Sequence, residues 1–137
     1  AATDCTAENG CLRVIPGSHS TQNTGNHFRD HSDGVTIPET LEEQEYDEAR
    51  ARDILLEAGQ MVIFDIYSVH GSHSNQSEVN RTGYALRFMP ATCHYDHNNI
   101  PVAESRGSAH HTRPLIQVRG TNQNGKNNFT MGHPPAT

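Results

Sequence analysis

This chain of 137 residues contains no tryptophan, and aromatic residues make up only 6% of it. Hydrophobic residues account for 33% of the composition. That is little for a self-sufficient core, although it is neither poor enough in apolar residues nor charged enough to predict wholesale disorder. The length fits one domain over residues 1–137. We therefore expect a single domain, part of whose core lies outside this sequence.

Other absences narrow the functional class. No apolar run approaches the ~20 residues that a membrane span needs, so we expect no membrane partner. The formal net charge is -6 and no basic stripe is present, which argues against a nucleic-acid surface. The chain opens with neither an initiating methionine nor the charged and apolar regions of a signal peptide. We expect a segment cut from a longer chain, or a processed product.

The cysteines do not form a recognisable framework. The chain has three, Cys5, Cys11 and Cys93, and none belongs to a C-x-x-C pair. An odd number without such spacing fits no set of disulfides, so a reducing compartment is the default. The sequence thus predicts a cytoplasmic protein.

What the chain does contain is a series of short strand signals separated by turn residues. They predict strands over 11–15, 54–56, 61–64, 84–88 and 115–118. The nearly continuous apolar run 61–64 is typical of a strand buried on both faces. With almost no helix, the pattern predicts an all-β sandwich or barrel, of which the jelly roll is one form.

Turn and helix signals fill the intervals. Asn9-Gly10 predicts a tight hairpin turn, and Pro16-Gly17 should end the first strand. A crowd of acidic residues over 39–48, with Thr40 as a cap, predicts a short solvated helix over 41–50. Residues 120–137 are rich in asparagine and glycine, and we expect a flexible polar tail there.

Two residues stand out as a candidate site. His70 directly follows an apolar strand signal, and Arg81 lies eleven residues further on, at the start of the next one. A neutral imidazole is a good ligand for Fe(II), Zn or Cu, and a guanidinium can bind a carboxylate through two parallel hydrogen bonds. If the two strands pair, both side chains could reach one cavity. The competing interpretation makes His70 a hydrogen-bonded core residue and Arg81 a surface cation.

Three stretches together resemble the phytanoyl-CoA dioxygenase family. They are TAENGCLRVIPGSH (6–19), GQMVIFDIYSVHGSHSNQSEVNR (59–81) and YALRFMP (84–90). The likeness implies a double-stranded β-helix, a jelly-roll or cupin-like fold that is incomplete here at its N-terminus. It also implies an oxygenase that uses Fe(II) as cofactor and 2-oxoglutarate as cosubstrate. Such an enzyme takes O2, converts 2-oxoglutarate to succinate and CO2, and hydroxylates a C–H bond of a small-molecule substrate.

The resemblance assigns roles residue by residue. His70 matches the second histidine of the iron triad. Arg81 matches the arginine that pairs with the distal carboxylate of 2-oxoglutarate, and Ser72 matches a small hydroxyl residue beside it. The Asn-Gly turn and residues 16–19 match scaffold near the pocket.

The chain departs from the family pattern in one respect. The family's other two iron ligands come from an H-x-D motif upstream of the Asn-Gly turn, and the chain has no such motif there. Two H-x-D strings follow the turn, His31-Ser32-Asp33 and His94-Tyr95-Asp96. Both stand in the wrong order for the family's ligands, and ten histidines with sixteen acidic residues produce such strings by chance.

Three interpretations follow. The first is the C-terminal part of an oxygenase domain that is catalytically inactive alone, because one histidine holds Fe(II) weakly. The second is a non-catalytic, cupin-like β-sandwich that binds a different metal or none. In the third, His31 and Asp33 fold back to complete a triad with His70 in permuted order.

Overall fold

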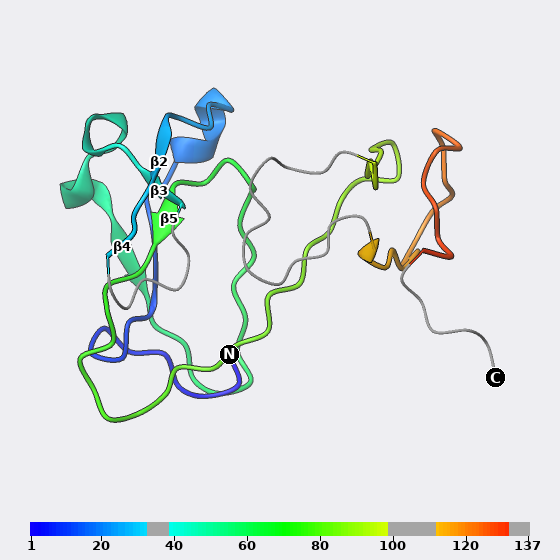
Figure 1. Ribbon diagram of the computed structural model, residues 1–137. Coiled ribbons are helices and arrows are strands. Elements are labelled where there is room, and N and C mark those ends of the chain that lie inside the picture. The colour runs from blue at the N-terminus through cyan, green and yellow to red at the C-terminus, as the bar shows by residue number, and fades with distance from the viewer. Residues whose placement is uncertain (33–38, 99–111, 132–137) are drawn as a thin grey trace. The chain divides into compact units, whose positions relative to one another are not determined.

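The computed structural model describes residues 1–32, 39–98 and 112–131, and the chain divides into two compact units, residues 1–85 and 86–137. The first unit contains all the named strands. Its main sheet has the order β4-β1-β5, in which β1 (Leu12–Val14) lies between β4 (Arg52–Ile54) and β5 (His70–Gly71). Both neighbours are antiparallel to β1. Figure 1 labels β4 and β5. The predicted first strand is confirmed, and the strand predicted over 54–56 begins two residues earlier.

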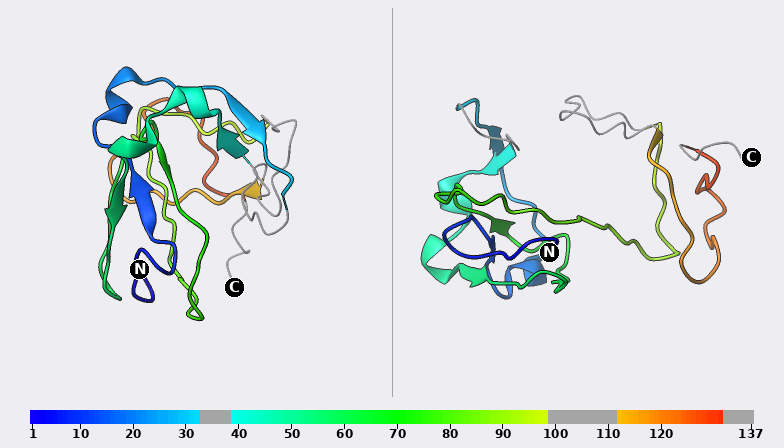
Figure 2. Two further views of the ribbon diagram at one scale, coloured as in Figure 1. Left: turned by 90° about the vertical axis from the view of Figure 1, so that its left-hand side faces the viewer. Right: turned by 90° about the horizontal axis from the view of Figure 1, so that it is seen from below.

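Pairing continues beyond these strands along the N-terminal residues. On one side, Cys5 forms a bridge with Leu56, and the Gly59 amide donates to the Ala1 carbonyl at 2.9 Å. On the other side, the Ala2 amide donates to the Thr82 carbonyl at 2.9 Å. Residues 1–14 therefore form a central segment, flanked by residues 52–60 and 70–82 (Figure 2).

The Asn9-Gly10 turn is present, but the predicted hairpin is wrong. Cys5 and Leu12 both pair antiparallel with the same partner strand, at Leu56 and Ile54, so the chain keeps its direction after the turn. Residues 6–11 form a loop closed by the Cys11 amide, which donates to the Thr6 carbonyl at 2.9 Å. The loop therefore interrupts one strand and does not connect two antiparallel strands.

The side chain of Asn9 holds this loop together. Its Oδ1 accepts the Thr6 amide at 2.8 Å, and its Nδ2 donates to the Asp4 carbonyl at 2.9 Å. Asn9 is buried, so these bonds replace contacts with water. Gly10 follows with φ 77°, a backbone conformation that other residues adopt only with strain.

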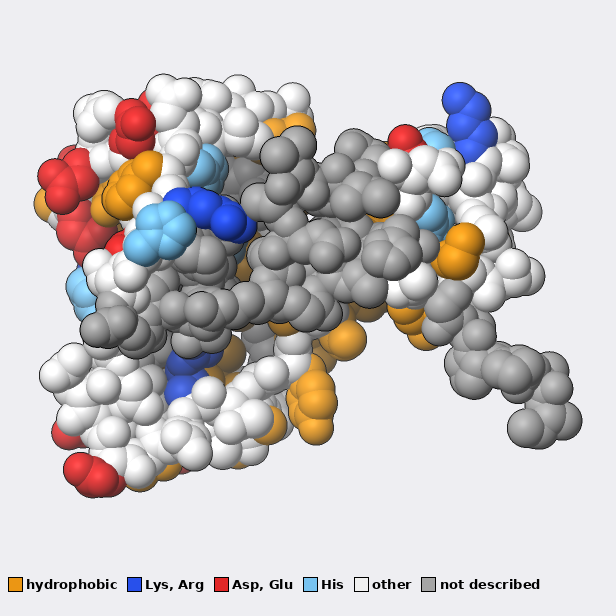
Figure 3. Space-filling view, in the orientation of Figure 1, with side chains coloured by type: hydrophobic (Ala, Val, Ile, Leu, Met, Phe, Trp, Pro, Cys, Tyr) orange, Lys and Arg blue, Asp and Glu red, His pale blue; other side chains and the backbone are white. Residues whose placement is uncertain are grey.

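The segment from 15 to 50 forms short elements. The 3-10 helix η1 (Ser18–Thr21) follows β1, and the strands β2 (His27–Arg29) and β3 (Glu39–Leu41) pair antiparallel in a second sheet. The helix predicted over 41–50 is wrong: the 3-10 helices η2 (Glu43–Glu45) and η3 (Glu48–Arg50) stand there instead. Tyr46 and Asp47 are extended between them, and the Asp47 carboxylate accepts the Ala49 amide, which starts a new turn. Acidic side chains gather on the surface in this region (Figure 3).

Arg13 ties η3 to the main sheet. Its Nε donates to Asp53 Oδ1 at 2.7 Å, and its Nη1 donates to Glu48 Oε1. The hydrogen bonds from the guanidinium to Asp53 and then Glu48 raise the pKa of Arg13 above its ordinary value. Residues 13 and 53 are paired in the β1–β4 register, so the ion pair reinforces that register.

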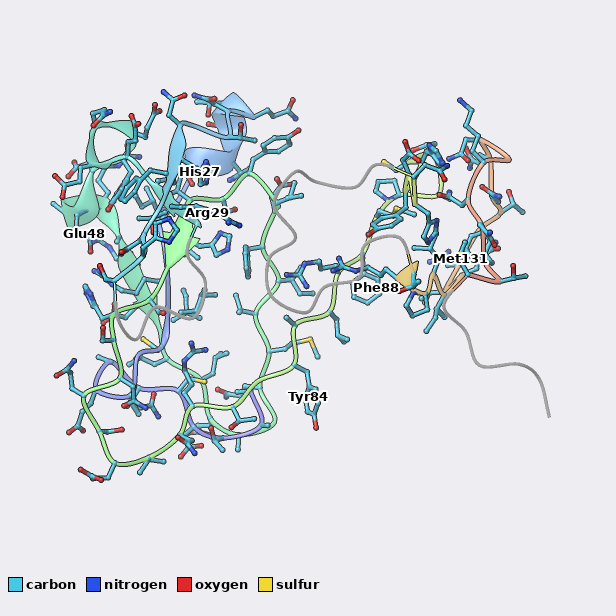
Figure 4. The ribbon with its side chains drawn as sticks, in the orientation of Figure 1. His27, Arg29, Glu48, Tyr84, Phe88 and Met131 are labelled. Atoms are coloured by element: carbon cyan, nitrogen blue, oxygen red, sulfur yellow. The ribbon has the colours of Figure 1, made fainter. Side chains whose placement is uncertain are left out.

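The buried strand predicted over 61–64 is wrong. Within the described residues this run makes no backbone hydrogen bond, and the side chains of Met61 and Ile63 are 77% and 88% exposed. The strand predicted over 84–88 is also absent, and Tyr84 extends away from the chain (Figure 4). Residues 115–118 form no strand either. A strand requires a neighbour to accept its hydrogen bonds, and no described segment forms a ladder with the runs 61–64 and 84–88.

The described part of the second unit contains turns held by asparagine side chains. Asn127 is buried, its Oδ1 accepts the Tyr95 amide at 2.8 Å, and its Nδ2 donates to the Cys93 carbonyl at 2.8 Å. These bonds join residues 93–95 to the stretch after Gly120. The flexible tail over 120–137 stays a prediction, and residues 132–137 lie outside the described part.

The described residues are thus β-rich, and their helical turns are all of the 3-10 type. Buried hydrophobic residues among them are few: Cys5, Cys11 and Ile15. The double-stranded β-helix remains a prediction. In the described part of the chain, no helix has the length and apolar character needed to cross a bilayer.

Replacing Gly10 with alanine should destabilise the first unit more than the same change at Gly59. Both glycines have positive φ, of 77° and 91°, so each alanine pays a backbone cost of ~1–2 kcal/mol. A Cβ at Gly10 would also lie 2.6 Å from the His73 carbonyl oxygen, whereas one at Gly59 meets nothing within 4 Å. We expect Gly10→Ala to lower the free energy of unfolding by at least ~1 kcal/mol more than Gly59→Ala does, as measured by urea unfolding followed by circular dichroism. Equal losses would contradict the close approach of the two backbones.

Arg13→Met should lower the free energy of unfolding by about 1 kcal/mol, because it removes two ion pairs from a side chain that is 18% exposed. Arg50→Met is the matched control, since that arginine lies on η3 and its side chain makes no ion pair in the described part of the chain. The difference should shrink in 1 M NaCl, where screening is strong. A loss that is the same for both variants would show that the pairs contribute nothing.

Candidate functional site

His70 occupies the first position of β5, directly beside Val14 of the central segment. Its side chain is exposed, and its Nδ1 lies 2.7 Å from the Ser68 carbonyl oxygen. A carbonyl can only accept a hydrogen bond, so Nδ1 carries a proton, and in the neutral ring Nε2 then keeps its lone pair. Within the described residues Nε2 has no hydrogen-bond partner. Metal-binding histidines commonly have their other ring nitrogen bonded to a backbone carbonyl in this way.

The turn that precedes His70 was not foreseen as a separate element. The Tyr67 amide donates to Asp65 Oδ1 at 2.9 Å, and the Ser68 amide donates to the Asp65 carbonyl at 3.0 Å. Ser68 is buried, which fixes the carbonyl that orients the imidazole. An aspartate at the first position of a four-residue turn is the sequence signal that could have identified it. The Phe64 ring lies against the imidazole, with centroids 4.9 Å apart.

The stretch 16–19, interpreted as scaffold, contacts the residue next to His70. Ser18 Oγ accepts the Val69 amide at 2.8 Å and donates to the Ile15 carbonyl at 2.8 Å. The Ile15 amide in turn donates to the Val69 carbonyl at 2.9 Å. Both backbone groups of Val69 are therefore bound, and the specific role of Ser18 is one that the sequence motif did not disclose.

Arg81 lies further along the same flank of the central segment. Its neighbours are fixed by Thr3, whose Oγ1 donates to the Asn80 carbonyl at 3.2 Å and accepts the Thr82 amide at 2.9 Å. The Arg81 side chain is exposed, and no ion pair or hydrogen bond holds its guanidinium among the described residues. A carboxylate from a ligand could therefore bind it without displacing a protein group.

The structure brings His70 and Arg81 to one flank of the central segment but to different ends of it, beside Val14 and Thr3 respectively. Ser72 is exposed and directly follows the end of β5, two residues after His70. A shallow hollow on this flank contains none of these three residues. It is lined by Asp4, Thr6, Glu8, Asn9, Ser77 and Val79.

A complete iron site is not assembled within the described ranges. Among residues 1–32, 39–98 and 112–131, no three His, Cys, Asp or Glu side chains gather closely enough to hold a metal ion. His31 is exposed, and Asp33 lies outside the described residues. His94 and Asp96 belong to the second unit, where the Asp96 carboxylate accepts the Asn98 amide at 2.9 Å. His70 therefore fits the chemistry of one ligand of a histidine–carboxylate iron site.

The cysteines do not extend the site. All three are free, Cys5 and Cys11 being buried and Cys93 exposed. Burial, followed by the nearby Asp53 carboxylate, raises the pKa of the Cys11 thiol. That thiol stays protonated at neutral pH and is a poor ligand and nucleophile.

Comparison with known proteins agrees with the motifs around His70 and Arg81. The sequence profile of the family described as Phytanoyl-CoA dioxygenase (PhyH) matches residues 1–83. A bovine protein named phytanoyl-CoA dioxygenase, peroxisomal, is 35% identical over 88 residues, which are 64% of this chain and 26% of that protein. An Aspergillus aculeatus protein named dioxygenase aneA is 32% identical over 112 residues, 77% of this chain and 32% of that protein. No solved structure gives a significant match.

A third relative, from Caenorhabditis elegans, is named phytanoyl-CoA dioxygenase domain-containing protein 1 homolog. It is 29% identical over 93 residues, which are 65% of this chain and 32% of that protein. The chain thus spans about a quarter to a third of the length of the curated relatives that it matches. The family profile covers more than half of the chain and includes both His70 and Arg81. The chain belongs to the phytanoyl-CoA dioxygenase family.

Proposed function

We propose that this chain forms part of an Fe(II)- and 2-oxoglutarate-dependent dioxygenase with a double-stranded β-helix fold. The observation that carries the proposal is the state of His70. Its Nδ1 is bound to the Ser68 carbonyl and its Nε2 lone pair is open, in the motif that the family profile matches. Family membership supports a dioxygenase-type activity, and the ligand roles below are the proposal.

His70 would bind the iron through Nε2, with the Ser68 carbonyl keeping the ring in one orientation. Arg81 would bind the distal carboxylate of 2-oxoglutarate through two parallel hydrogen bonds, with Ser72 beside it. Iron(II), when bound, supplies the oxidative chemistry that couples 2-oxoglutarate and O2 to hydroxylation of a small-molecule substrate. The residues of this chain would orient the reactants. Arg81 is available to bind the cosubstrate because its guanidinium has no protein partner among the described residues.

We further propose that the 137-residue chain is inactive by itself. Its described residues supply one imidazole in a suitable state, whereas the facial arrangement of such oxygenases uses two histidines and one carboxylate. A cytoplasmic location is part of the same proposal, since the three cysteines are free thiols.

The second candidate is a non-catalytic binding module. One observation favours it: His70 and Arg81 lie beside opposite ends of the central segment, and the hollow on that flank contains neither. In that case the open Nε2 of His70 would bind another metal or none.

The isolated chain should bind Mn(II), a redox-stable substitute for Fe(II), more weakly than micromolar in isothermal titration calorimetry. One imidazole without two further ligands is a weak site. His70→Ala should remove whatever binding remains. His73→Ala is the control, because this exposed histidine lies on the same flank outside β5. Micromolar binding by the unaltered chain would contradict the proposed inactivity.

Arg81→Gln, made in the longest chain that the gene encodes, should raise the KM for 2-oxoglutarate by about 10- to 100-fold and change kcat less. The estimate follows from charge-assisted hydrogen bonds worth roughly 1.5–3 kcal/mol. Succinate release measures the activity, and Arg50→Gln on η3 serves as the control for loss of one positive charge. An unchanged KM would remove Arg81 from the cosubstrate site.

A further inference from the structure

One peptide group links Ser18 to His70. The N–H of Val69 and the C=O of Ser68 belong to the same planar unit and point in opposite directions. The N–H donates to Ser18 Oγ at 2.8 Å, and the C=O accepts His70 Nδ1 at 2.7 Å. Rotation of this plane would break both bonds together. The orientation of the imidazole is therefore coupled to a hydroxyl from a different element.

The hydroxyl of Ser18 is itself fixed. It has one proton, which it donates to the Ile15 carbonyl at 2.8 Å, so a lone pair faces the Val69 amide. Ser18 begins η1 immediately after Gly17, whose φ of 81° turns the chain back toward β5. The Ile15 amide binds the Val69 carbonyl at 2.9 Å and clamps the next peptide group as well.

Burial makes this link effective. Ile15 and Ser68 are buried, with 7% and 9% exposure, and Ser18 is half-buried. Water competes poorly for groups in such a place, and a hydrogen bond to the amide N–H polarises the carbonyl at the other end of the same group. The exposed imidazole thus receives a fixed acceptor from a buried network.

We propose that Ser18 is a positioning residue for His70, acting through the Ser68–Val69 peptide group to keep the proton on Nδ1 and the lone pair on Nε2. The consequence for iron binding rests on the proposed function, in which His70 is a ligand. The tautomer itself does not, because it belongs to the metal-free chain. Ser18 contacts neither metal nor cosubstrate in this account, and its influence passes through one peptide plane.

The test measures the His70 tautomer directly, from the ¹⁵N shifts of both ring nitrogens in the metal-free chain at a pH of about 8.5, where free imidazole is neutral. Ser18→Ala should lower the ratio of the Nδ1–H to the Nε2–H tautomer by roughly fivefold, the effect of losing one hydrogen bond. Ser18→Thr keeps the hydroxyl and should restore the ratio. Ser20→Ala is the matched control, since Ser20 Oγ donates to the Gly17 carbonyl of the same turn at 2.8 Å without touching Val69.

An unchanged ratio in Ser18→Ala, or an equal change in Ser20→Ala, would overturn the proposal. If Ser18→Ala unfolds, amide exchange in the unaltered chain decides: strong protection of Val69 supports the link, and exchange as fast as at exposed Ser74 overturns it. A tautomer that responds to Ser18, together with metal binding that survives His70→Ala in the longest chain that the gene encodes, would retain this inference and reject His70 as an iron ligand. Failure of the Ser18 inference and failure of the proposed iron site would therefore give different results.

Discussion

The pairing of residues 1–14 with a strand on each side is the constraint on which the first unit depends. Among the described residues, β1 is the only strand that pairs with β4 and β5 in the main sheet, and Ala1 to Cys5 extend the same pairing toward Gly59 and Thr82. Buried hydrophobic side chains are few in the described residues, so the order of this unit depends largely on backbone hydrogen bonds and on side-chain bonds to the backbone. Asn9 and Ser18 are the clearest cases, because each satisfies backbone groups of its own turn that packing does not.

The positions of the candidate site residues depend on that pairing. His70 is placed because Val14 lies beside it and because Ile15 and Ser18 bind Val69 just before it. Arg81 is placed because Thr3 binds the residues on either side. One half of the candidate site thus depends on the end of the central segment and the other half on its beginning. A change that shifts the segment by one residue would move both functional side chains.

The apolar runs show the limits of composition and pattern. The low content of hydrophobic residues predicted a poor core, and the described residues confirm it, with Met61, Ile63 and Tyr84 largely exposed. The run 61–64 has two β-branched residues and a phenylalanine, and the run 84–88 has two aromatic residues, yet neither forms a strand. Strand formation depends on a neighbouring backbone at the right spacing, and no property of the run itself provides that neighbour.

The sequence alone determined the features set by local chemistry. Asn9-Gly10 and Pro16-Gly17 made turns because their backbone preferences act within a few residues, and the motif around His70 and Arg81 identified the family. Only the tertiary structure decided that the loop 6–11 interrupts one strand without reversing the chain. It also decided that the stretch 41–50 contains two 3-10 helices, η2 and η3, and not one helix. It alone also joined Ser18 to His70, 52 positions apart in the chain. Contacts between distant residues depend on which segments meet in space, and a local pattern contains no information about that.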